Sequence, residues 1–414
     1  MNREKANRSV IAVGRPRIVR NDRVARLSAS VDIAGRKTEI WFEVDSAYGA
    51  YLCDERADAF LAGLLHYAML HGHDLELEAP VTAQLLFQVR AWLIPTLTKF
   101  DSRLRAPTIR AIAAEAPIPN AGAVGTGISC GVDSFHVVCN HLSPRETGPK
   151  LTHAVLNNVG AFGANGEAQR KWQIENARRF CEEIGLPLIV TDSNIFDVLC
   201  QDHGHTHGYT GTFAVYCLQK LFGTYLYGSS GLDLGSFTVR KAARSDSGGY
   251  ELMLFDCFST RNLKIYSEGA AKTRFEKLRQ VVGYEPSERY LHVCIAKSGG
   301  NCGSCGKCRR TLTALDALGA LDRYAAVFDV AAYRAKRKSH LRWLVWQQLD
   351  RQGAQLTKET YALLKSDIPM TERIGLRLVH ALYRAFWLTQ DKKDFLKASF
   401  PALFRIYRKL FPVA

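Results

Sequence analysis

The chain has 414 residues, of which 47% are hydrophobic and 23% are charged, as in a folded globular protein and unlike a disordered one. Its length suffices for two or three domains, and no apolar run approaches the roughly 18 residues of a membrane-spanning helix. The basic N-terminal segment lacks the apolar core of a secretory signal, so we expect a cytoplasmic protein without a membrane partner. The formal net charge of +15 favours anionic ligands.

Residues 1–116 are predicted to form an N-terminal α+β domain. Residues 23–33 and 38–44 alternate apolar and polar side chains around a short turn, which predicts a hairpin. Helical spacing of apolar residues predicts helices over 54–72 and 82–97. Two prolines and a glycine in the segment 115–122 indicate a domain boundary, placed at 116/117.

Residues 117–318 alternate between predicted strands and helices. The strands are 123–129, 151–157, 186–192 and 224–230, and the helices between them are 133–142, 167–185 and 210–223. This alternation predicts an α/β fold, a doubly wound parallel sheet with helices on both faces. Residues 319–414 are predicted to form a basic helical region, since residues 331–414 hold 17 Lys and Arg but 6 Asp and Glu, a net charge of +11.

The segment GISCGVDSF, residues 127–135, joins the first strand of this domain to its first helix. One interpretation is an ordinary turn in which Asp133 or Ser134 caps the helix. The other is an anion site, because ligands of doubly wound sheets bind where strands end and helix N-termini point outward. Gly131 would let the backbone approach a phosphate, and Ser129 and Ser134 would donate hydrogen bonds. No Walker A motif occurs in the chain.

The order Ser129-Cys130-Gly131-Val132-Asp133-Ser134 resembles the SGGxDS loop of the PP-loop ATP pyrophosphatases, which belong to the adenine nucleotide alpha-hydrolase or HUP-like folds. The resemblance implies that the loop holds the pyrophosphate part of ATP, with Mg²⁺ near Asp133. Cys130 replaces the first glycine, and a positive φ there would strain it. The resemblance further implies nucleotide contacts at Asn157, at Gly228 within the segment 227–231, and at Arg274, which stands where the family tends to have a lysine.

Four cysteines, Cys294, Cys302, Cys305 and Cys308, follow the spacing C-x7-C-x2-C-x2-C. Four thiolates predict a structural, tetrahedral Zn²⁺ site that ties the nucleotide domain to the first C-terminal helix, with an iron–sulfur cluster or plain thiols as alternatives. The loop and this cluster together resemble the 7-cyano-7-deazaguanine synthases over residues 122–318. Because both ends of the chain lie outside the resemblance, we expect a divergent relative with another acceptor, a small molecule or even a macromolecule.

The segment DHGHTHGYT places Asp202, His203, His205 and His207 in a predicted loop before a helix. An imidazole beside ATP could act as a base, which makes His205 and His207 catalytic candidates together with Asp133 and Ser134. The alternative is a polar loop. The basic segments 333–343 and 404–411 could bind nucleic acid, or they form a solvated face or a homodimer contact.

The predicted function is ATP-dependent adenylation of a carboxylate or carbonyl oxygen with release of pyrophosphate, followed by attack of ammonia or an amine. Residue 2 is Asn, not the cysteine of an N-terminal glutaminase, so ammonia is expected to come from outside. A PP-loop enzyme that thiolates tRNA or a small molecule is one alternative. A nucleotide-binding module without turnover is the other.

Overall fold

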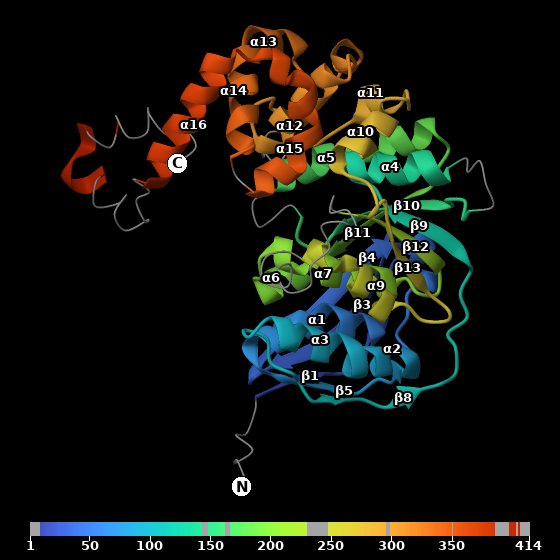
Figure 1. Ribbon diagram of the computed structural model, residues 1–414. Helices are drawn as coiled ribbons and strands as arrows, with labels where there is room; N and C mark the ends of the chain where they lie inside the picture. The colour runs from blue at the N-terminus through green and yellow to red at the C-terminus, as the bar shows by residue number, and fades with distance from the viewer. Residues whose placement is uncertain are drawn as a thin grey trace. The chain divides into compact units, whose positions relative to one another are not determined.

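The computed structural model describes residues 9–142, 148–161, 166–229, 247–294, 299–349, 351–385, 397–402 and 405 (Figure 1). The chain divides into two compact units, Met1–Asn301 and Cys302–Ala414. Ser230, Gly231 and most of the basic segment 404–411 lie outside the described residues, and so do the predictions made for them.

One large, mostly parallel sheet organises the first unit. Among the described residues it has eleven strands, in the order β13-β12-β9-β10-β11-β4-β3-β1-β5-β7, with β2 paired to β3. The strands are β1 Val10–Val13, β2 Arg17–Arg20, β3 Val24–Ile33, β4 Arg36–Asp45, β5 Asp74–Leu77, β7 Ile109–Arg110, β9 Ala123–Gly127, β10 His153–Asn158, β11 Leu188–Ser193, β12 Phe222–Gly228 and β13 Lys264–Glu268. A separate pair joins β6 (Val81–Thr82) to β8 (Ala113–Ala114).

The strands β9 to β13 form the predicted parallel half of the sheet. Counted along the chain from β9, their spatial order is 3-2-1-4-5, the order of Rossmann-like doubly wound folds. The predicted strands of this region are all present, so the α/β class is confirmed at this level.

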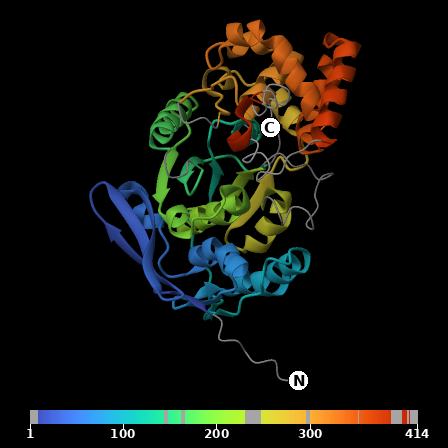
Figure 2. The same ribbon diagram turned by 90° about the vertical axis from the view of Figure 1, so that its left-hand side faces the viewer.

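The predicted hairpin of the N-terminal region is confirmed as β3 and β4 (Figure 2). Its two-residue turn places Ala34 and Gly35 at φ values of 53° and 92°, which suits the twist of a tight hairpin. β4 then pairs antiparallel with β11, and the Ser193 hydroxyl donates to the Trp41 carbonyl. Residues 1–116 therefore continue the same sheet as the parallel strands, and the sequence-based boundary at 116/117 falls within the first unit.

Helices cover both faces of the sheet (Figure 1). One layer contains α1 (Asp58–His71), α7 (His203–Cys217) and α9 (Glu251–Phe258), and the other contains α4 (Val132–His141), α5 (Glu167–Glu183) and α10 (Arg274–Val281). The remaining helices of the first unit in the described residues are α2 (Ala83–Gln88), α3 (Ile94–Phe100), α6 (Ile195–Leu199) and α11 (Ser287–Tyr290), with a π-helical segment, Val89–Leu93, between α2 and α3.

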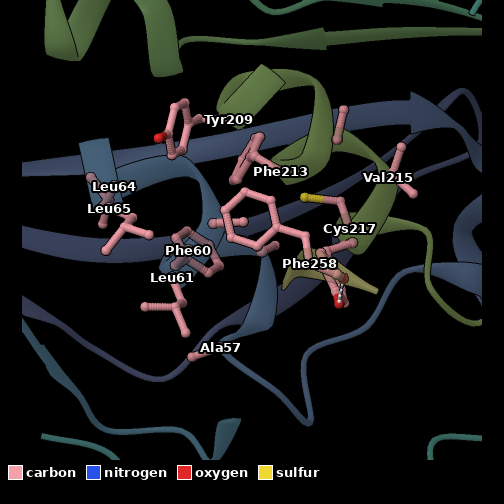
Figure 3. Close-up of a cluster of buried hydrophobic side chains, with 14 of the residues drawn as sticks. Ala57, Phe60, Leu61, Leu64, Leu65, Tyr209, Phe213, Val215, Cys217 and Phe258 are labelled. Carbon is pink, nitrogen blue, oxygen red and sulfur yellow. Dashed lines mark hydrogen bonds between the residues drawn. The ribbon is translucent and has the colours of Figure 1, made fainter. Parts of the chain in front are cut away.

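The core of the first unit lies where α1 meets α7 (Figure 3). Phe213 packs edge-to-face against Phe60, with ring centroids 5.8 Å apart, and against Phe42 at 6.1 Å. Gly63 allows this approach, because a Cβ there would lie 3.1 Å from Phe213. The close contact of α1 with α7 ties residues from the N-terminal region to the parallel half of the sheet.

The described secondary-structure elements of the second unit are all helical, as predicted for residues 319–414. Its helices are α12 (Gly306–Ala317), α13 (Val330–Ala335), α14 (Arg337–Gln347), α15 (Arg351–Leu364) and α16 (Met370–Ala385). Its small core includes Leu341, Leu344 and Val345 from α14. In the described parts of the chain, no helix combines the length and apolar character needed to cross a membrane.

Candidate functional site

The switch point of the parallel strands lies between β9 and β12. From β9 the chain proceeds to β10 on one side, whereas β12 lies on the other side of β9. In doubly wound sheets the crevice for ligands opens at this point, beyond the carboxyl ends of the strands. The loop after β9 contains the predicted Ser129–Ser134 motif, and Ser229 follows β12, so both lie at the carboxyl ends of these two neighbouring strands.

The loop keeps a glycine-like conformation at Cys130. This residue has a φ of 54° and a fully buried side chain, and its carbonyl accepts a hydrogen bond from the His292 amide at 2.8 Å. The Ser129 hydroxyl accepts from the Gly131 amide at 3.3 Å. Burial raises the pKa of the Cys130 thiol, which therefore stays protonated at neutral pH. The loop accommodates cysteine at a position where glycine would be unstrained.

The helix α4 begins directly after this loop, with Gly131 as its N-cap and no capping side chain. Neither Asp133 nor Ser134 caps it, so this detail of the turn interpretation is wrong. The Ser134 hydroxyl instead donates to the Gly131 carbonyl at 3.0 Å. The first amides of a helix have no acceptor within the helix, and they lie at the positive end of the helix dipole.

Asp133 is held by two cations from α10. Its carboxylate lies 2.9 Å from the Arg274 guanidinium and 3.4 Å from the Lys277 ammonium. The Lys277 side chain is fully buried and also donates to the Ser229 carbonyl at 3.1 Å, so it joins the loop after β9 to the end of β12. Burial lowers the pKa of Lys277, and the charge of Asp133 counteracts part of that shift.

Lys277 is absent from the predicted site residues, although the sequence at the start of α10 points to it. Thr273 and Glu276 form a capping box at the start of α10, which fixes Arg274 and Lys277 in its first turn. Basic residues are unfavourable in the first turn of a helix, because they oppose the helix dipole. Two of them after a capping motif indicate that an anionic group is nearby.

A polar network behind the site connects α4 with β13 and α10. The Asn140 amide donates to Glu268 at 3.0 Å and accepts from Gln280. The His141 ring lies 3.2 Å from Glu268, and this contact raises the pKa of His141. Burial alone would raise the pKa of Glu268, but the hydrogen bonds from His141 and Asn140 lower it overall. The network fixes the spacing of the helices that present Asp133 and its cations.

The prediction of a loop for the segment 202–207 is wrong, because the structure places its histidines in the first turns of α7. Asp202 is the N-cap and accepts from the His205 amide at 3.3 Å. The helix therefore begins about two turns before the start predicted at residue 210. His207 reaches the Tyr227 hydroxyl at 2.8 Å. Tyr227 precedes Gly228, where a Cβ would lie 3.4 Å from the Asp133 backbone. His207 is therefore connected to the site through Tyr227, whereas the ring of His205 lies near Asp202.

Asn157 and Asn158 end β10, beside the switch point, and their side chains bind the neighbouring strand. Asn157 accepts from the Thr191 hydroxyl at 2.8 Å, and Asn158 donates to Asp192 at 2.7 Å. Asp192 also pairs with Arg170 at 2.9 Å. An adenine contact in this region would therefore fall to the backbone, as the family resemblance implies.

The four clustered cysteines come together as their spacing predicts. Their sulfur atoms all lie within 4.8 Å of one another, and those of Cys302 and Cys308 are 4.0 Å apart. Tetrahedral Zn²⁺ with Zn–S bonds of about 2.3 Å requires sulfur separations of about 3.8 Å, close to that of Cys302 and Cys308. The Cys305 and Cys308 amides donate to the sulfurs of Cys302 and Cys305 at 3.3 and 3.5 Å, and Gly303 has a φ of 67° in the turn between the first pair. The cluster is compatible with zinc, and four thiolates leave no position for a substrate.

The described residues also contain a cavity of about 520 Å³ beside α3, lined by Arg90, Ile94, Pro95, Thr98, Lys99, Ala106 and Pro107. None of the predicted site residues lines it. Those that the structure gathers at the switch point are Ser129, Cys130, Gly131, Val132, Asp133, Ser134, Gly228 and Arg274. No protein-family model, no curated protein and no solved structure matches the chain.

Proposed function

We propose that this chain binds ATP with Mg²⁺ at the switch point and adenylates a carboxylate or carbonyl oxygen of an acceptor. The observation that carries the proposal is the Ser129–Ser134 loop at the switch point, opposite Arg274 and the buried Lys277. Two basic side chains, one of them buried, share the single carboxylate of Asp133, and this arrangement favours an anionic ligand close by. In the PP-loop family that ligand is the pyrophosphate part of ATP.

The residues present fit a triphosphate. The amides at the start of α4 and the hydroxyls of Ser129 and Ser134 supply hydrogen-bond donors, and Arg274 suits bidentate contact with phosphate oxygens. Asp133 is the carboxylate that would help to hold Mg²⁺ together with phosphate oxygens and water. Catalysis would rest on positioning and on charge stabilisation at the phosphates.

The proposed reaction consists of two successive displacement steps. The acceptor oxygen forms a bond to the α-phosphorus while the bond from that phosphorus to pyrophosphate breaks. Ammonia or an amine then forms a bond to the acceptor carbon, and the bond from that carbon to AMP breaks. The zinc that the cysteine cluster would hold supplies a fold-stabilising crosslink and takes no part in these steps.

The buried thiols of Cys130, Cys139 and Cys181 give no support to the thiolation alternative. Burial raises the pKa of Cys139 and of Cys181 to about 12, and it also raises that of Cys130 in the loop itself. Sulfur transfer needs a thiolate nucleophile, and these three thiols are protonated at neutral pH. We therefore favour nitrogen transfer, as in the 7-cyano-7-deazaguanine synthases, with a different acceptor.

Calorimetry with Mg²⁺-ATP tests the binding site. Ser134→Ala and Lys277→Met should each weaken ATP binding by about tenfold or more, because each removes a contact to a charged phosphate. Lys264→Met is the matched control: it removes the same charge from the opposite end of β13 and should bind ATP like the wild type. Unchanged ATP affinity in both folded site variants would show that the loop is not a phosphate site.

Pyrophosphate release, screened with carboxylates and ammonia, then separates an enzyme from a module that only binds nucleotide. ATP binding without release under any condition would favour the non-catalytic module. Turnover that depends on tRNA and a sulfur donor would favour the thiolation enzyme.

A further inference from the structure

One side of the helix α16 packs against α14 within the second unit (Figure 1). Leu376 packs against the small core around α14, and Glu372 pairs with Arg342 and Lys338 of α14. Glu372 and Leu376 are four residues apart, so they lie on the same side of the helix. This side is the buried one.

The opposite side of α16 exposes an apolar stripe of Met370, Ile374 and Leu378. These side chains are 68%, 46% and 62% exposed, although they rank among the most apolar residue types. Their spacing of four residues aligns them along the helix axis, about half a turn away from the packed side. Exposed apolar side chains gathered in a row with polar flanks indicate a binding surface.

The sequence on and around the stripe is cationic. Arg377 is exposed between Ile374 and Leu378, and residues 331–414 carry a net charge of +11. The sequence after α16, residues 386–414, contains seven aromatic residues and six Lys and Arg residues. Apolar, aromatic and basic residues combined on and after one amphipathic helix are typical of segments that lie in a membrane interface.

We propose that the α16 stripe docks the protein on an anionic lipid surface. The apolar side chains would enter the boundary between headgroups and acyl chains, while Arg377 and the neighbouring cations contact the lipid phosphates. A second copy is a poorer occupant, because it would bring two strongly positive segments together. Nucleic acid would engage the cations but leave the apolar stripe without a partner. This proposal is independent of the ATP site and departs from the expectation of no membrane partner.

Cosedimentation of the full chain with vesicles tests the proposal. The protein should bind vesicles of phosphatidylcholine containing about a third phosphatidylglycerol but not pure phosphatidylcholine, and added salt should weaken binding. Ile374→Ser and Leu378→Ser should each reduce partitioning by about tenfold, and Arg377→Gln by about fivefold. These side chains are exposed, so the variants should keep the wild-type melting temperature.

Val19→Ser is the matched control, because Val19 is 60% exposed on β2 in the first unit and lies outside the stripe. It should bind vesicles like the wild type. The proposal is overturned if no vesicle is bound, if neutral and anionic vesicles bind equally, or if the double variant Ile374→Ser, Leu378→Ser still binds. Binding of RNA or DNA without binding of vesicles would identify a nucleic-acid surface. A dimer in sedimentation velocity that the double variant abolishes would identify a second copy as the occupant.

Discussion

At the scale of a single residue, Cys130 places a side chain in a backbone conformation that glycine adopts freely. Its φ of 54° lies in the left-handed region, where a Cβ costs about 1 kcal/mol. The sulfur is fully buried, so its packing offsets part of this strain. The loop thus accommodates a cysteine at a position where glycine would be unstrained.

We predict that Cys130→Gly is more stable than Cys130→Ala by about 1 kcal/mol. Both variants lose the buried sulfur, but only glycine relieves the left-handed strain, so the alanine variant serves as the control for lost packing. Urea unfolding of both variants measures the difference. A glycine variant less stable than the alanine variant would mean that the backbone at this position is not strained.

At the scale of an element, the cysteine cluster determines how α12 begins. Cys305 is the N-cap of α12, and its side chain accepts from the Cys308 amide. A metal bound by these thiolates would fix the first turn of the helix and the preceding turn at Gly303. Because ligands must be brought together for binding, metal affinity appears as folding free energy.

We predict about one zinc per chain by metal analysis, without the visible absorption of an iron–sulfur cluster. Cys305→Ser should lower the melting temperature by on the order of 10 °C, as expected for a loss of about 3 kcal/mol. Turnover per folded molecule should stay near that of the wild type, because the cluster has no open coordination position. Cys200→Ser, which changes an exposed cysteine outside the cluster, should leave the melting temperature unchanged. A Cys305→Ser protein that melts normally but has lost all turnover would instead assign chemistry to the cluster.

At the scale of the whole molecule, buried neutral histidines make stability depend on pH. Burial lowers the pKa values of His66 in α1 and His136 in α4 to about 4, and that of His340 in α14 likewise. In the unfolded chain these histidines become protonated near pH 6.5, whereas in the folded chain they stay neutral down to about pH 4. Stability is therefore lost as the pH falls from 6.5 towards 4. The raised pKa of His141 acts above this range: its stabilisation is gained as the pH falls towards 6.5 and stays constant below that value.

We predict that the unfolding free energy of the first unit falls as the pH is lowered from 7 to 5. Below pH 6.5, each buried histidine should contribute about 1.4 kcal/mol per pH unit to this fall. Urea unfolding at several pH values measures the slope. His136→Phe should remove the contribution of one histidine from the slope of unfolding free energy against pH. His71→Phe, at an exposed position, should leave the slope unchanged. Equal slopes in the wild type and His136→Phe would show that His136 is already protonated in the folded state.

The sequence by itself determined the features that depend on neighbouring residues. Apolar alternation around Ala34 and Gly35 specifies the hairpin, Gly72 ends α1 in the left-handed conformation, and the short spacing of the cysteines brings their sulfurs together. The strand and helix alternation after residue 117 specified the parallel half of the sheet. These signals are local, because turn chemistry and side-chain periodicity act within one element.

Only the tertiary structure decided which distant segments meet. The pairing of β4 with β11 merges two regions that the prolines near residue 116 appeared to separate, because strand pairing depends on register and not on the linker between strands. Asp202 caps α7, so the histidine segment that was predicted to be a loop is helical. Lys277 lies 144 residues from Asp133 in the chain, and its burial against Asp133 and Ser229 becomes visible only when α4, α10 and β12 converge. Such contacts are absent from local sequence patterns, because the free energy that holds them comes from burial in the assembled fold.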